Sequence, residues 1–154
     1  MKRFYPIICL TLLIVIFFSC DKKSNPTESN NYEYSQSDLA GTWEGNTTIK
    51  GSSNDGTYKS TIIIDNNGKM VSFSPSSGFD TVTGTISVKI DGQITGGVQT
   101  THIETIGYTE TTTMTWDGSK FLNKTQIDLI INSAWSSTNG SSGNYTIKGT
   151  MNKK

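Results

Sequence analysis

Residues 81–94 read TVTGTISVKIDGQI, and this stretch decides the fold class. Apolar or small residues alternate with polar ones, a period of two that places neighbouring side chains on opposite faces of a β-strand. Asp91-Gly92 then predicts a tight hairpin turn before Ile94, because these residue types suit the turn backbone. The pattern indicates antiparallel strands with one buried face and one solvated face. The expected inward set is Val82, Gly84, Ile86, Val88 and Ile90.

The same alternation recurs on both sides of this stretch. Turn signals at Asp65-Asn66-Asn67-Gly68 and Asp117-Gly118 separate the strands. Residues 127–135 fit helical spacing as well as strand spacing, and their β-branched residues favour a strand. About eight to ten short strands predict an all-β, antiparallel up-and-down barrel, with a β-sandwich as the alternative. The other expected strands cover residues 43–50, 58–64, 71–73, 108–116 and 145–151.

The amino terminus carries a targeting signal. Met1-Lys2-Arg3 is basic, and the apolar run Ile7–Phe18 is shorter than the roughly 20 residues that span a bilayer. This order predicts a secretory signal helix. The segment Phe17-Phe18-Ser19-Cys20 resembles a bacterial lipoprotein signal, in which the cysteine after a small residue is lipidated and becomes the acylated terminus. The resemblance implies removal of residues 1–19 and lipidation of Cys20. An ordinary cleaved signal and an uncleaved anchor are the alternatives.

The residues after the signal predict a tether and one domain. Residues 20–34 are polar and without apolar periodicity, which is typical of a flexible segment. Residues 35–154 then form the barrel domain. Of the two cysteines, Cys9 falls in the signal, so the mature chain has no internal disulfide. The lipoprotein resemblance implies a membrane partner and a place on the bacterial outer membrane, at its periplasmic face or at the cell surface.

Composition narrows the class of partner. Without residues 1–19 the chain keeps 135 residues, with 11 lysines and 13 acidic residues. A net charge of about −2 lacks the basic stripe of a nucleic-acid-binding protein, so no nucleic-acid partner is expected. One domain of this size is expected to be a monomer.

A second resemblance concerns the barrel. Leu39-Ala40-Gly41-Thr42-Trp43-Glu44-Gly45 is similar to the Gly-x-Trp stretch that begins lipocalin-like barrels, where the tryptophan packs at the closed end. Trp135, the Gly- and Ser-rich turn and Tyr145 are similar to the closing hairpin of small lipocalin-like and avidin-like barrels. The arginine that covers the tryptophan in lipocalins has no counterpart, since Arg3 is the only arginine. We expect the first and last strands to pair, with Trp43 packed against Tyr145 or Ile147.

The residues that could carry chemistry are few. His102 is the only histidine, too little for a closed zinc shell, and no nucleophile motif accompanies it. We interpret His102 as an ordinary strand residue and expect no metal, no cofactor and no enzymatic activity. Glu110 shares a strand face with Tyr108, Met114 and Trp116. It is either a ligand contact inside the barrel or, in the favoured alternative, solvated because a bulge shifts the strand.

The resulting hypothesis is a binding module. It holds a small apolar or amphipathic ligand, or a glycan, in an aromatic-lined mouth, as in binding sites that are mostly apolar with a few polar groups. The alternative is a structural or interaction lipoprotein whose packed barrel docks a partner in the cell envelope. The candidate ligand contacts are Trp43, Tyr58, Phe73, Tyr108, Glu110 and Trp116.

Overall fold

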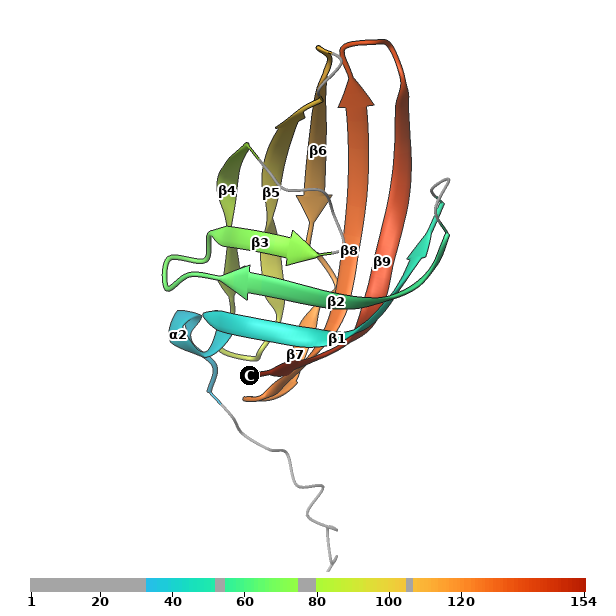
Figure 1. Cartoon of the computed structure of the whole chain (residues 1–154). Helices are drawn as coiled ribbons and strands as arrows, with labels where there is room; N and C mark the ends of the chain where they lie inside the picture. Colours follow the sequence, from blue (N-terminus) through green and yellow to red (C-terminus); the bar gives the residue numbers. More distant parts are fainter. Residues whose placement is uncertain (1–32, 52–54, 75–79, 105–106) are drawn as a thin grey trace, which may run out of the picture. The chain divides into compact units, whose positions relative to one another are not determined.

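A computed structural model describes residues 33–51, 55–74, 80–104 and 107–154 (Figure 1). Cys20, the signal and residues 20–32 of the expected tether lie outside the described residues. No helix in the described ranges is long and apolar enough to cross a membrane. The elements are α2 (Gln36–Leu39), β1 (Gly41–Lys50), β2 (Gly56–Ile64), β3 (Met70–Ser74), β4 (Thr81–Val88), β5 (Ile94–Ile103), β6 (Thr109–Thr115), β7 (Lys120–Asn123), β8 (Gln126–Ser137) and β9 (Ser142–Lys153).

The strands form one antiparallel sheet that curls into a nearly closed barrel. Its order is β3-β2-β1-β9-β8-β6-β5-β4, with β7 beside β8. The first strand pairs with the last over eight residues, from Trp43 opposite Lys153 to Lys50 opposite Thr146. The all-β barrel and the pairing of its terminal strands are therefore confirmed. Residues 127–135 lie within β8, so the strand interpretation of that stretch is also confirmed.

The barrel stays open between β3 and β4, where three hydrogen bonds join β4 to the turn before β3 and to α2. The Ile86 amide donates to the Gly68 carbonyl oxygen at 2.8 Å. The Gln36 side chain of α2 donates to the Ile86 carbonyl oxygen at 2.9 Å and accepts from the Val88 amide at 3.3 Å. Gly68 has a φ of +77°, and a Cβ there would collide with the Ile86 carbonyl oxygen. A glycine is needed at this position for both reasons.

Trp43 fills the end of the barrel that α2 covers. Its side chain is fully buried, and its indole nitrogen donates to the Leu39 carbonyl oxygen at 2.8 Å. The Phe121 ring meets it edge-on at 5.8 Å, and the Lys153 ammonium lies 5.5 Å from its centroid. The expected partners of Trp43 were wrong. The strand register places Ile147 opposite Ile49, six residues or about 20 Å further along β1.

One inward position of the opening sequence pattern was also wrong. β4 ends at Val88, and Ile90 is 65% exposed in the turn that follows. In this turn the Lys89 amide donates to the Gln93 carbonyl oxygen and the Gly92 amide donates to the Lys89 carbonyl oxygen, each at 2.8 Å. The Ile90 carbonyl oxygen instead accepts from the Tyr34 amide at 3.1 Å. The Tyr34 ring stacks on Phe121 with centroids 4.6 Å apart. Tyr34, at the end of the expected tether, thus packs against the barrel.

Candidate functional site

The two ends of the barrel differ in how far they are covered. In Figure 1, β1, β2 and β3 cross the lower half of the longer strands, and the upper ends of β5, β6, β8 and β9 extend beyond them. The inner face of these upper ends forms the mouth of the barrel. Its residues follow from the registers of β4, β5, β6, β8 and β9, which run through this region without a shift.

The inner face of the mouth consists of three cross-strand rows. The rim row joins His102, Glu110 and Ser137 across β5, β6 and β8. The middle row joins Val82, Thr100, Thr112 and Trp135, and the floor row joins Val98, Met114, Ser133 and Tyr145. Polar side chains dominate the rim and are interleaved with apolar ones below it.

Exposure falls from the rim inward along β5 and β8. The His102 side chain is 30% exposed, whereas Thr100, two residues deeper on β5, is 3% exposed. On β8 the corresponding step runs from the partly exposed Trp135 to Ser133, which is 4% exposed. In the floor row Tyr145 is still partly exposed, whereas Val98 and Met114 already belong to the buried core.

His102 lies between two carboxylates at the rim. Its Nδ1 is 3.3 Å from Asp80 Oδ2, and its Nε2 is 3.8 Å from Glu104 Oε1. Asp80 Oδ2 is held in place by the backbone amide of Ile103, which donates to it at 2.6 Å. The Nδ1 atom is buried and makes no hydrogen bond within the described ranges. His102 is a strand residue, as expected, and it faces the inside of the barrel.

Glu110 keeps its place on the inner face. It lies opposite His102 on one side and Ser137 on the other, and neither register shifts there. The bulge expected in the favoured interpretation is absent, and Glu110 faces the inside of the barrel. The reason is that the threonines on both sides of Glu110 pair regularly with β5, so no extra residue enters the strand. Its side chain is partly exposed at the mouth.

Tyr145 brings a phenol from β9 toward these groups. Burial raises the pKa of the Tyr145 phenol, and the nearby charge of Glu110 raises it further, against the opposing effect of polar contacts with Ser133 and Thr112. The Ser133 Oγ itself is buried, and no hydrogen bond of good geometry satisfies it within the described part of the chain. A buried hydroxyl without a partner is costly, so this atom is the least satisfied polar group of the floor row.

Trp135 adds an aromatic wall to the mouth. From the sequence, this residue was noted only for its similarity to the closing hairpin of lipocalin-like and avidin-like barrels. Its indole lies over Gly143, because a Cβ on that glycine would come within 2.7 Å of the indole nitrogen. The missing side chain at position 143 thus makes room for the ring beside the mouth. Strand parity could have placed Trp135 and His102 on the inner face, but it could not set them in adjacent rows.

The six candidate ligand contacts separate into two groups. Trp43, Phe73 and Trp116 belong to the buried core. Tyr108, just before β6, and Glu110 lie at the mouth, while Tyr58 is a partly buried residue of β2. The structure places Glu110 opposite His102 in the rim row and Tyr145 two rows deeper, and it separates these three from Trp43.

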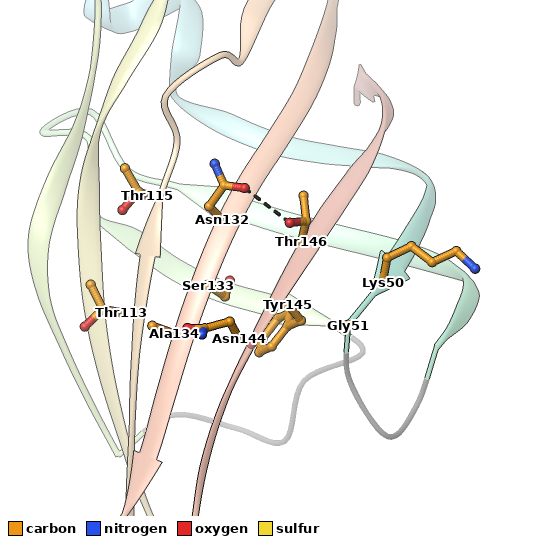
Figure 2. Close-up of a pocket in the computed structure, with 10 residues that line it drawn as sticks. All are labelled: Lys50, Gly51, Thr113, Thr115, Asn132, Ser133, Ala134, Asn144, Tyr145 and Thr146. Carbon is orange, nitrogen blue, oxygen red and sulfur yellow. Dashed lines mark hydrogen bonds between the residues drawn. The ribbon is translucent and has the colours of Figure 1, made fainter.

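A shallow concavity of about 440 Å³ lies on the outer face, across β1, β6, β8 and β9 (Figure 2). Its floor is polar and uncharged, and Thr146 Oγ1 donates to Asn132 Oδ1 there at 3.2 Å. Lys50 is the charged residue at its edge. The remaining lining residues are Gly51, Thr113, Thr115, Ser133, Ala134, Asn144 and Tyr145.

The described residues include no group of three or more His, Cys, Asp or Glu placed to hold a metal ion. His102 and its two carboxylate neighbours, Asp80 and Glu104, form a polar rim. Neither a protein-family model nor the sequence of a curated protein matches this chain.

Proposed function

We propose that this protein is a lipid-anchored binding protein of the bacterial cell envelope. It holds a small amphipathic or apolar ligand, or a glycan, against the inner face of the barrel mouth, and it catalyses no reaction. Cys20 carries the lipid. The polar residues that follow it let the domain extend away from the membrane surface, and the protein acts at the outer membrane. The rim and middle rows contact the ligand, with Trp135 as the aromatic wall.

The observation that carries this proposal is the polar floor beneath the mouth. Ser133 is 4% exposed, and apart from its polar contact with the Tyr145 phenol its hydroxyl makes no hydrogen bond of good geometry within the described ranges. By contrast, Thr47 and Ser60, buried elsewhere inside the barrel, bond to each other at 2.6 Å. A barrel that only needs to be stable gains from satisfying or replacing such a hydroxyl, whereas a binding site leaves polar groups for its ligand.

The direct test is native mass spectrometry of the protein purified from its own membranes. We expect an added small-molecule mass that is lost on denaturation. Thr112→Phe, which fills the middle row, should abolish the adduct. Thr113→Phe is the matched control, because it places the same side chain on the outer face of the same strand. An adduct that survives Thr112→Phe but is lost with Thr113→Phe would move the site to the outer face.

The proposed location has its own test. Protease treatment of intact cells should degrade the domain if it is exposed at the cell surface, and should spare it if it faces the periplasm. Recovery of the protein in the inner-membrane fraction would contradict both forms of the proposal.

The second candidate function is a structural or interaction lipoprotein, and the outer concavity favours it. Its uncharged Thr and Asn floor offers hydrogen bonds to a partner in the envelope without the cost of burying charges. In that case Ala134→Glu, which puts a carboxylate into the concavity, should release the partner, and Thr112→Phe should have no effect. Cross-linking in intact cells, with each variant compared to the unaltered protein, separates the two functions.

A further inference from the structure

We infer that the concavity on the outer face of the barrel binds a neutral glycan chain through the hydroxyl and amide side chains of its floor. This inference rests on the second candidate function, whose partner it names by chemical class, and it is independent of the mouth. Two observations carry it, namely a charge-free area on the outer face and the hollow within that area.

Six outward-facing side chains of β6, β8 and β9 form the floor of the concavity in two cross-strand rows. The registers of these strands run through both rows without a shift. One row continues across β5 and β4 with Gln99 and Thr83, and the other continues with Gly97 and Thr85. The six floor residues are Thr113, Ala134 and Asn144 in the first row, and Thr115, Asn132 and Thr146 in the second.

These two rows carry no charge on β4, β5, β6, β8 and β9, and the next row toward the mouth consists of threonines and serines. At standard strand spacings, three rows on five strands cover about 19 Å by about 14 Å. Charges begin at the border of this area. Lys50 on β1 ends the second row, Lys148 lies in the row below it, and Asp128 lies one row further. The rows that form the concavity are thus uncharged, whereas the rows beneath them are not.

The second observation is that the charge-free area is hollowed. The concavity of about 440 Å³ is bounded on one side by Lys50 and Gly51, where β1 ends against β9 (Figure 2). Gly51 has a φ of +91°, and a Cβ there would lie 3.0 Å from the Asn144 carbonyl oxygen, so a glycine permits this close approach. Ala134, in the middle of the floor, adds little bulk. The hollow therefore arises from backbone approach and small side chains.

The floor offers the mixture of donors and acceptors that sugar hydroxyls require. Thr146 Oγ1 donates to Asn132 Oδ1 at 3.2 Å, which leaves the amide nitrogen of Asn132 free to donate. The side chains of Asn144 and Thr115 make no hydrogen bond within the described ranges. A sugar hydroxyl both donates and accepts, so it can pair with either kind of group. A neutral ligand also avoids the desolvation cost of bringing a charge to this surface.

The composition of the floor disfavours the other classes of partner. The core of a protein interface is enriched in aromatic residues, methionine and arginine. Among the floor residues Ala134 is the one apolar side chain, and the Tyr145 phenol at the edge points to Ser133 and Thr112 on the inner face. One lysine at the edge is not the basic stripe of a nucleic-acid site. An uncharged, polyhydroxylated chain is the partner that this floor matches.

The test is native electrophoresis of the purified full chain in gels that contain mannan, dextran or mixed-linkage β-glucan. Polygalacturonate serves as the anionic probe. We expect at least one neutral polysaccharide to retard the protein relative to a gel without polysaccharide, and polygalacturonate to have no effect. Isothermal titration with a hexasaccharide of the retarding polysaccharide should give a dissociation constant that salt does not change, because no charges take part.

Thr146→Phe, which fills the floor, should weaken this binding at least about tenfold, as for the loss of about 1.4 kcal/mol. Thr150→Phe is the matched control, because it places the same side chain on the same face of β9 but outside the concavity, opposite Asp128. Asn132→Ala should weaken binding about two- to tenfold through lost hydrogen bonds. Urea unfolding checks that each variant is folded.

Three results would overturn the inference: equal binding by Thr146→Phe and Thr150→Phe, retardation by polygalacturonate alone, or no retardation by any of the four polysaccharides. Glycan binding that is lost with Thr112→Phe but kept with Thr146→Phe also overturns it, and supports the proposed function because the glycan then lies in the mouth. The proposed function fails separately if no small-molecule adduct depends on Thr112 while Thr146→Phe still abolishes glycan binding.

Discussion

Replacing Trp43 by alanine should destabilise the domain more than truncating any aromatic side chain at the mouth. Truncating a fully buried large aromatic costs about 3–5 kcal/mol. Trp43 is 0% exposed, and its loss also leaves the Leu39 carbonyl oxygen without its 2.8 Å donor in a buried place. An unsatisfied buried acceptor costs about 1–3 kcal/mol. The edge contact with Phe121 disappears as well. We therefore expect a loss at the upper end of the range, about 5 kcal/mol.

Urea unfolding followed by circular dichroism measures this loss, provided that the slope with denaturant is unchanged. A domain of this size has about 5–15 kcal/mol in total, so Trp43→Ala should be close to unfolding at room temperature. Trp43→Phe keeps most of the packing and removes the donor, and should cost about 1–3 kcal/mol. Trp135→Ala is the control, because the partly exposed ring at the mouth buries less surface. A loss below about 1 kcal/mol for Trp43→Ala, or an equal loss for Trp135→Ala, would refute the assignment of Trp43 to the closed end.

Three further predictions concern the anchor, the gap in the barrel and the mouth. Cys20→Ser should abolish labelling by a clickable fatty acid and move the protein out of the membrane fraction, and labelling that persists would contradict the lipid assignment. Gly68→Ala should cost about 2 kcal/mol or more in unfolding free energy, because its φ is +77° and its Cβ would meet the Ile86 carbonyl oxygen. Gly140→Ala is the matched control, with a φ of +91° and nothing within 4 Å, and an equal loss would mean that Gly68 does not bridge the gap. The raised pKa of the Tyr145 phenol favours its neutral form in the folded state, so its contribution to stability is complete below the ordinary pKa of 10.0 and is lost as the pH rises through the higher folded value. Absorbance titration should therefore lose its highest-pH phenolate step in Tyr145→Phe, and an unchanged titration curve would show that this step belongs to another tyrosine.

The sequence could predict features that depend on neighbours along the chain. Alternation with a period of two set the inner and outer faces, as the buried Ile62, Ile64 and Ile131 show. Local turn chemistry placed the hairpin at residues 65–68, where the Asp65 carboxylate accepts from the Asn67 and Lys69 amides at 2.9 Å each. The same local preferences favoured strand over helix in β8.

The tertiary structure decided everything that depends on register between strands. Parity says which face a side chain takes, but a shift of two residues keeps that face and changes every cross-strand neighbour. For this reason Trp43 could be assigned to the closed end while its partners Phe121 and Lys153 could not be named. The grouping of residues at the mouth also depends on strand register. His102 and Glu110 belong to consecutive strands and Ser137 to a more distant one, and only the registers of β5, β6 and β8 bring the three into one row above the buried hydroxyl of Ser133.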